Sequence, residues 1–278
     1  MYDNKLHVVA CAASGALYWT SVASLHFAPH QAIVVALLIF AVYQLNRLSD
    51  VDEDERNCPE HLAAAFEHRR VIMWVSCGCG LAAGALALSV DGWRVMPLGL
   101  LAALLAILYS GGIGALSLTP KVKRIPGVKN LVPAACWTAA AVFYPALASQ
   151  HWGADVGLAA ALMFCGCLAV ELLWDVRDVP GDRGSGISTI PTLIGVPRTR
   201  RLLIILLGAL STVLIGSSLS GFTFFSPALV PVGILLAFTI RLRSSVKRRA
   251  YDDLVLALAL SLLAGWGAIQ VQNVSLFV

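Results

Sequence analysis

Charged residues are scarce in this sequence. Asp, Glu, Lys and Arg make up 13% of its 278 residues, whereas an ordinary soluble domain carries about 25%. Hydrophobic residues make up 58%, and they form blocks close to the roughly 20 residues that an α-helix needs to cross a bilayer. This composition excludes a collagen, a disordered chain and a disulfide-stapled domain. It predicts an all-α polytopic membrane protein.

Other signals are also missing. The sequence has no strand-like alternation and no G-x-x-x-x-G-K loop for nucleotide phosphates. Its seven cysteines are an odd number, and most lie within apolar blocks, so a disulfide framework is not expected. The net charge of +4 comes from basic residues that lie between hydrophobic blocks rather than on one soluble patch. We therefore expect membrane lipid, and no nucleic acid, as a partner.

Hydrophobic blocks separated by charged or Pro/Gly-rich breaks predict nine membrane spans. They cover residues 7–27, 31–48, 71–90, 95–117, 130–149, 154–174, 201–221, 226–241 and 251–272. With the N-terminus in the cytoplasm, 19 of the 20 Lys and Arg residues fall in inside loops, and only Arg94 falls outside. The positive-inside rule therefore predicts a cytoplasmic N-terminus and a C-terminus on the opposite side. Because the spans use nearly the whole chain, residues 1–278 are expected to form a single membrane domain.

Acidic residues gather at the inner ends of the second and sixth predicted spans. Asn46, Asp50 and Asp54 are spaced four apart, so they share one face of a helix. Asp178 and Asp182 form a second ridge if the helix continues past the intervening proline. Stacked carboxylates near hydrocarbon repel each other unless a cation neutralises them, and oxygen ligands of this kind suit Mg²⁺. The alternative for either cluster alone is a solvated acidic loop, but two clusters on one predicted face favour a metal site.

A basic stretch lies between the two acidic clusters in the sequence. Its cationic residues are Lys121, Lys123, Arg124 and Lys129. They could bind phosphate oxygens, or they could simply anchor the loop inside, as the positive-inside rule requires. The flanking acidic clusters favour phosphate binding. A second basic run at 241–249 lacks such neighbours, so it is interpreted as an anchor to anionic lipid.

These motifs resemble those of the UbiA superfamily of intramembrane prenyltransferases. Residues 46–54 resemble the family's first N-x-x-x-D-x-x-x-D motif, and the DVRDVPGDR stretch at 175–183 resembles its second. The stretch at 186–191, GISTIP, is similar to the segment that follows the second motif. The stretch at 123–130, KRIPGVKN, is similar to the family's middle basic loop.

The resemblance implies a nine-helix bundle around a central cavity, with cytoplasmic active-site loops near 46–70, 118–130 and 175–200. Two Mg²⁺ ions would bind a prenyl diphosphate. The metal ligands implied are Asn46, Asp50, Asp54, Asp175, Asp178 and Asp182. The catalytic residues implied are Asp50, Asp54, Asp178 and Asp182. The diphosphate contacts implied are Asn46, Lys121, Lys123, Arg124 and Lys129, with Arg47 and Arg177 as weaker candidates because each could instead pair with a neighbouring carboxylate.

The function expected from these features is Mg²⁺-dependent transfer of a prenyl group to a lipophilic acceptor inside the membrane. Metals and cationic side chains would stabilise the departing diphosphate, and an apolar chamber would shield the allylic cation from water. An intramembrane terpene cyclase is the close alternative, because the same cation can be trapped by its own double bonds. A cation-coupled transporter is a remote alternative, because its carboxylates would be expected at the midplane of the bilayer.

Overall fold

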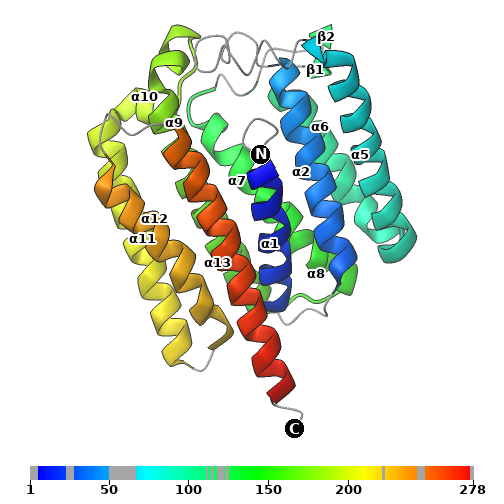
Figure 1. Ribbon diagram of the computed structural model, residues 1–278, viewed down its shortest axis with the longest axis vertical. Coiled ribbons are helices and arrows are strands. Elements are labelled where there is room, and N and C mark those ends of the chain that lie inside the picture. Colours follow the sequence, from blue (N-terminus) through cyan, green and yellow to red (C-terminus); the bar gives the residue numbers. More distant parts are fainter. Residues whose placement is uncertain are drawn as a thin grey trace.

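Helices that run side by side dominate the computed structural model (Figure 1). It describes residues 6–22, 28–49, 67–110, 112–113, 116–117, 122, 125–220, 223–242 and 248–275. In the first half, the helices are α1 (Leu6–Val22), α2 (Pro29–Ser49), α5 (Arg69–Asp91), the short 3-10 turn η1 (Trp93–Val95) and α6 (Met96–Ser110). The prediction of a helical bundle is confirmed.

A short hairpin follows α6. Strands β1 (Gly112–Ile113) and β2 (Leu116–Ser117) pair antiparallel. The predicted span at 95–117 is therefore too long at its C-terminal end, where residues 111, 112 and 114 are glycines. Glycine costs about 1 kcal/mol relative to alanine inside a helix, which favours ending the helix there. The strands escaped the sequence prediction because two residues are too few to show alternation.

The second half begins with one continuous helical segment over residues 128–149. It consists of α7 (Val128–Thr138), the π-helical turn η3 (Ala139–Phe143) and α8 (Tyr144–Ser149). The amide of Tyr144 donates to the carbonyl of Ala139, five residues back. Pro145 follows directly and has no N–H for the carbonyl four residues earlier. The missing bond explains why the helix widens into a π turn at this point.

Helix α9 (Ala154–Gly184) is ten residues longer than the predicted span at 154–174. The hydrophobic run ends at 174, but the chain stays helical through the polar motif and through Pro180. A proline removes one intrahelical hydrogen bond, which costs least near the end of a helix. The remaining helices are α10 (Ile190–Ile194), α11 (Val196–Leu219), the 3-10 turn η4 (Thr223–Ala228), α12 (Leu229–Arg241) and α13 (Arg248–Ser275).

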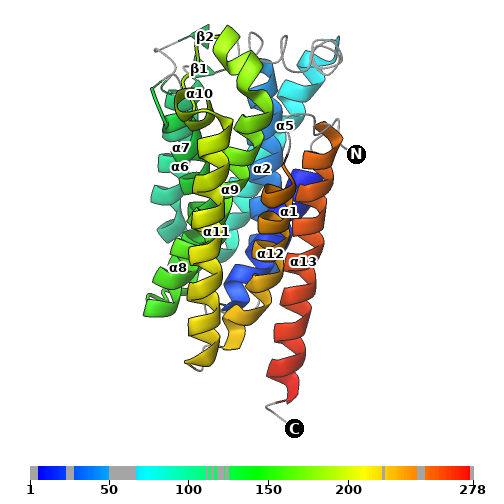
Figure 2. The same ribbon diagram turned by 90° about the vertical axis from the view of Figure 1, so that its left-hand side faces the viewer.

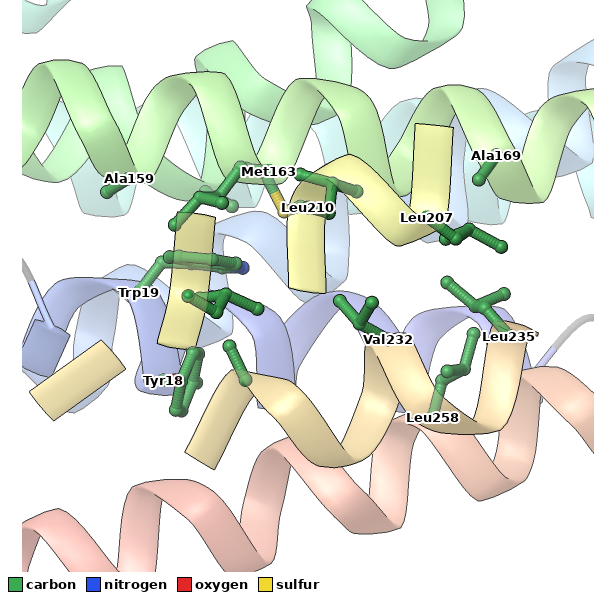
Figure 3. Close-up of a cluster of buried hydrophobic side chains, with 14 of the residues drawn as sticks. Tyr18, Trp19, Ala159, Met163, Ala169, Leu207, Leu210, Val232, Leu235 and Leu258 are labelled. Carbon is green, nitrogen blue, oxygen red and sulfur yellow. The ribbon is translucent and has the colours of Figure 1, made fainter. Parts of the chain in front are cut away.

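Helix α1 lies at the centre of the bundle, where it packs extensively against α13 and α2. One hydrophobic cluster joins α1, α9, α11, α12 and α13, and Figure 3 shows its side chains meeting between these helices. The packing is tight at Gly265 of α13, where a Cβ would lie 3.1 Å from the ring of Tyr18 and 3.0 Å from Pro227. Glycine at this position allows α13 to approach α1 closely.

The outer surface of the bundle is apolar. Among the described residues, six helical segments are long and apolar enough to cross a bilayer, and three shorter apolar helices accompany them. On α5, Trp74 and Leu81 are exposed by 72% and 76%, which is the side-chain placement expected towards lipid tails rather than water. The chain is a multi-pass integral membrane protein. The number of nine spans stays a prediction.

The two ends of the bundle carry different features. Helix α10, the C-terminal end of α9 and the β1–β2 hairpin lie together at one end, and the C-terminal end of α13 lies at the other (Figures 1 and 2). The end that holds α10 also holds the second acidic motif, because that motif occupies the last turns of α9. The candidate site therefore lies at one end of the helices, as the sequence predicts.

Candidate functional site

Two carboxylates of the second acidic motif are buried against one lysine. The Nζ atom of Lys129 lies 2.6 Å from Oδ1 of Asp182 and 3.7 Å from Oδ1 of Asp175. The two aspartates are seven residues apart, which is two helical turns, so they lie on the same face of α9. Asp182 is completely buried and Asp175 nearly so. Of the four cationic residues of the basic loop, Lys129 is the one within the described residues, and the structure brings it to this motif.

Asn130 completes this arrangement, and the sequence did not indicate it as a site residue. Its amide nitrogen donates to Oδ2 of Asp175 at 2.5 Å, and its amide oxygen accepts from the backbone N–H of Ile190 at 3.1 Å. One buried side chain therefore links α7, α9 and the start of α10. We call Lys129, Asn130, Asp175 and Asp182 the α9 polar cluster.

Gly127 sets the start of α7 and so the position of the α9 polar cluster. It has a left-handed φ of 80° at the helix N-cap, a conformation that side chains with a Cβ rarely adopt. Its backbone N–H donates to the carbonyl of Ser188 at 3.3 Å, which ties the basic loop to the segment after the second motif. The sequence stretches that resemble the family's middle loop and the segment after its second motif are therefore in direct contact.

Asp178 makes a separate ion pair. Arg177 donates to both of its carboxylate oxygens, at 2.8 Å from Nε and 2.6 Å from Nη2. The guanidinium also lies 5.8 Å from the ring centre of Trp174 and 5.7 Å from that of Tyr251, within the range of a cation–π contact. The pairing of Arg177 with a neighbouring carboxylate was the alternative left open by the sequence. Asp178 and Asp182, predicted to form a ridge, make different contacts.

The first acidic motif is described only at its start. Asn46 lies in the last turn of α2 and is half-buried. Asp50, Asp54, Lys121, Lys123 and Arg124 lie outside the described residues, as does the side chain of Arg47. Their predicted roles stay predictions.

The oxygen donors at the end of α9 fit part of a Mg²⁺ site. Within the ranges that the structure describes, no group of three His, Cys, Asp or Glu side chains is placed to hold a metal by itself. Mg²⁺, however, is usually held by one or two carboxylates together with substrate phosphates. Asp175 and Asp182 already enclose the ammonium of Lys129, which shows that positive charge is stable between them.

An apolar cavity borders the motif. Its empty space, including that at its open edge, is about 850 Å³. Its wall comes from α1, α9, α11, α12, η4 and α13, with Tyr43 from α2 and Trp137 from α7, and Figure 3 shows part of it around Trp19 and Met163. Along α9 the wall runs from Leu162 to Trp174, about 18 Å at 1.5 Å per residue. The cavity therefore ends one residue before Asp175.

Four aromatic side chains contribute to the cavity wall: Trp19, Tyr43, Trp137 and Trp174. Tyr43 makes edge-to-face contacts with Trp137 and Trp174, with ring centres 6.3 and 6.4 Å apart. These rings lie at the end of the cavity next to the acidic motif. Chemically, the arrangement can hold a molecule with an apolar chain and a polar head: the chain in the cavity and the head beside the α9 polar cluster.

Fold and site together define an integral membrane protein that places a carboxylate–lysine cluster beside an apolar cavity. The family model described as the UbiA prenyltransferase family matches residues 8–263, and the chain belongs to that family. The resemblance noted in the sequence is confirmed.

Among characterised relatives, the chain is similar to the digeranylgeranylglyceryl phosphate synthases of Thermococcus kodakarensis and Methanoculleus marisnigri. It is 29% identical to the first over 175 residues and 30% identical to the second over 173 residues. Each match covers 60% of this chain, and 58% and 57% of the respective relative. The chain therefore matches less than two thirds of the length of these relatives.

A solved structure shares the fold. The apo structure of a UbiA homolog from Aeropyrum pernix K1 superposes with a TM-score of 0.72, over 92% of this chain and 96% of that one, at 16% sequence identity. The helix arrangement is therefore that of a UbiA homolog, although few residues are shared.

Loss of the Asn130 side chain is expected to destabilise the protein. Asn130→Ala removes a buried amide that serves both Asp175 and the backbone of α10, so the free energy of unfolding should fall by about 1–3 kcal/mol. Thermal unfolding in detergent measures this. Thr138→Ala is the matched control on α7, because the Thr138 hydroxyl bonds only its own helix, at the Ala134 carbonyl. An equal effect of both substitutions would contradict the linking role of Asn130.

Proposed function

We propose that the protein ionises a prenyl diphosphate with the help of Mg²⁺ and transfers the prenyl group to a lipophilic acceptor within the membrane. The observation that carries this proposal is the direct junction of the α9 polar cluster with the apolar cavity. A prenyl diphosphate has the same division into a charged head and an apolar chain. The names of the matched relatives, which are synthases of a prenylated glyceryl phosphate, support the same reaction class.

In the proposed mechanism, acidic side chains bind the metal and basic side chains contact the diphosphate. The proposed metal ligands are Asn46, Asp50, Asp54, Asp175, Asp178 and Asp182. When bound, Mg²⁺ supplies positive charge that stabilises the departing diphosphate. Lys129 lies between two of the carboxylates, and its ammonium would also be placed to donate to a phosphate oxygen of the bound donor. Lys121, Lys123 and Arg124 are proposed as further diphosphate contacts.

The cavity would protect the reacting carbon. Its wall is almost entirely apolar, and exclusion of water prevents quenching of an allylic cation. The rings of Tyr43, Trp137 and Trp174 lie next to the diphosphate end and present π-electrons to positive charge. The residues that bind and orient the prenyl chain therefore come from many helices, whereas the charged head is held at the ends of α2 and α9 and by the basic loop.

The aromatic wall also favours a second candidate, an intramembrane terpene cyclase. Product analysis by mass spectrometry separates the two. The purified protein in lipid receives Mg²⁺ and geranylgeranyl diphosphate, with and without a glyceryl phosphate acceptor that carries one prenyl chain. Transfer predicts a product that contains both substrates and depends on the acceptor. A cyclic hydrocarbon or alcohol formed from the donor alone would establish the cyclase instead.

The proposed site lies on the cytoplasmic face of a single membrane domain formed by residues 1–278 and nine spans. Helix α9 has 31 residues and is about 46 Å long, so Gln150 and Ser185 lie at opposite ends of it. In a variant without the seven native cysteines, Ser185→Cys and Ser245→Cys are expected to react only with a cytoplasmic thiol reagent, and Gln150→Cys only with an external one. Labelling of positions 150 and 185 from the same side would refute this orientation.

A further inference from the structure

The apolar cavity is closed at the end remote from the α9 polar cluster. Its wall there includes Trp19 of α1, Leu162 of α9, Leu214 of α11 and Ala228 of η4. These side chains are exposed by 5%, 5%, 1% and 2% in that order, so protein rather than lipid surrounds them. Figure 3 shows the indole of Trp19 beside Met163 at this end of the buried cluster. The largest side chain of the closed end is therefore that of Trp19.

The indole of Trp19 is held in place by its neighbour Tyr18. The two rings meet edge to face, with centres 5.1 Å apart and planes at 79°. Tyr18 is itself completely buried against α13, where a Cβ on Gly265 would lie only 3.1 Å from its ring. Side chains that are packed this closely resist displacement. Trp19 thus forms a firm end wall of the cavity.

The length of the cavity can be compared with that of a prenyl chain. Along α9, the wall from Trp174 to Leu162 spans about 18 Å. An isoprene unit contributes four main-chain bonds of about 1.5 Å each, so it is about 5 Å long when extended. About four units therefore fill the distance between the end next to the acidic motif and the end wall.

We propose that Trp19 limits the prenyl chain of the donor to about four isoprene units. This inference rests on the proposed function and adds the length of the donor chain and the residue that selects it. A longer chain would have to displace buried side chains, and overpacking of this kind is unfavourable. A shorter chain leaves part of the apolar wall uncovered, and each methylene that is not buried weakens binding about 4-fold.

The first test removes the end wall with Trp19→Ala. The donors are the geranyl, farnesyl, geranylgeranyl, geranylfarnesyl and hexaprenyl diphosphates, which contain two to six isoprene units, and the acceptor is a monoprenylated glyceryl phosphate. For the wild type, we expect kcat/KM to fall about 10- to 100-fold from the four-unit to the five-unit donor. Because the indole is larger than one isoprene unit, Trp19→Ala should use the five-unit donor about 10-fold better than the wild type does.

Trp152→Ala is the matched control for loss of an indole. Trp152 is exposed by 60% and packs against Phe143 rather than in the cavity wall. Its replacement should leave the ranking of the five donors unchanged. Thermal unfolding in detergent checks that both variants are folded.

The second test shortens the cavity and does not depend on a variant that leaves a hole in the core. Gly166 lines the cavity on α9, eight residues before Trp174, which is about 12 Å. A Cβ at this position would meet no described atom within 4 Å. The side chain of Gly166→Leu can therefore enter empty space, and the loss of a glycine favours the helix.

We expect Gly166→Leu to lower kcat/KM for the four-unit donor about 10- to 100-fold and to leave that for the two-unit donor unchanged. Gly157→Leu is the matched control, because Gly157 lies on the same helix, is exposed, and also has open space around its Cβ position. It should leave the whole donor series unchanged.

Three results would each overturn the inference. They are equal use of four-unit and six-unit donors by the wild type, an unchanged donor ranking in folded Trp19→Ala, and an unchanged ranking in folded Gly166→Leu. In each of these cases, transfer to the acceptor by the wild type still supports the proposed function. Failure of the wild type to transfer any of the five prenyl groups would instead overturn the proposed function itself.

Discussion

Replacement of Asp182 by asparagine is expected to lower kcat for prenyl transfer by about 10²–10³-fold. Asp182 is fully buried, and one of its oxygens lies 2.6 Å from Nζ of Lys129. The amide keeps the shape of the side chain but removes the charge that would hold Mg²⁺ beside the diphosphate. Because this charge matters most as the leaving group develops its own, the loss should fall on kcat more than on donor binding.

Asp155→Asn on the same helix is the control for the substitution itself. It removes a carboxylate of similar size that pairs with His151 at the opposite end of α9. Steady-state kinetics in lipid, with folding checked by thermal unfolding, measure both variants. The equivalent change Asp50→Asn tests the first motif and should have an effect of the same size. Full activity of a folded Asp182→Asn protein would remove the second motif from the site.

Removal of divalent metal is expected to abolish turnover completely. The carboxylates of both acidic motifs carry negative charge, and without Mg²⁺ they would repel the diphosphate rather than bind it. Addition of EDTA should therefore stop product formation, and excess Mg²⁺ should restore it. Turnover at the original rate in EDTA would contradict a metal-dependent mechanism.

A control distinguishes loss of metal from damage to the protein. Thermal unfolding of the same samples should show that the fold persists in EDTA, because Lys129 and Asn130 still satisfy Asp175 and Asp182. A fall in stability equal to that of Asn130→Ala would instead indicate that the metal has a structural role.

Hydropathy predicted the apolar parts of the helices well, because transfer into lipid depends on the side chains alone. Helix α5 starts at Arg69 and ends at Asp91, within two residues of the predicted span at 71–90. The end of α9 was missed for the same reason. Ten residues after 174, five of them charged, continue the helix, where contacts with Lys129 and Asn130, rather than lipid, stabilise it.

The sequence indicated the chemistry of the site but not its pairings. The acidic motif and the basic loop were both recognised. The sequence alone, however, does not show which of the four cationic residues in the loop contacts the motif. Only the fold shows that Lys129 reaches Asp182, since this depends on the left-handed turn at Gly127 that starts α7. The resemblance itself supplied the second motif's role and the expectation of Asp175 as a ligand.

The role of Asn130 could not be predicted from the sequence for a different reason. A single amide or carboxylate at the edge of a hydrophobic block gives no pattern, because its meaning depends on what lies opposite in space. Asn130 acquires its role from Asp175 and Ile190, which are 45 and 60 residues away from it in the sequence. Gly127, three residues before Asn130, was the one local signal in the sequence that could have placed Asn130 near the site.

The most direct test is a structure of the protein in lipid with Mg²⁺ and a prenyl thiodiphosphate that cannot ionise. The convergence of both acidic motifs on one diphosphate predicts metal ions about 2.0–2.1 Å from oxygens of Asp50 and Asp182. The diphosphate should contact Lys129, and the prenyl chain should lie in the cavity between Trp174 and Trp19. A diphosphate bound away from Asp182, or a prenyl chain outside this cavity, would contradict the proposed site.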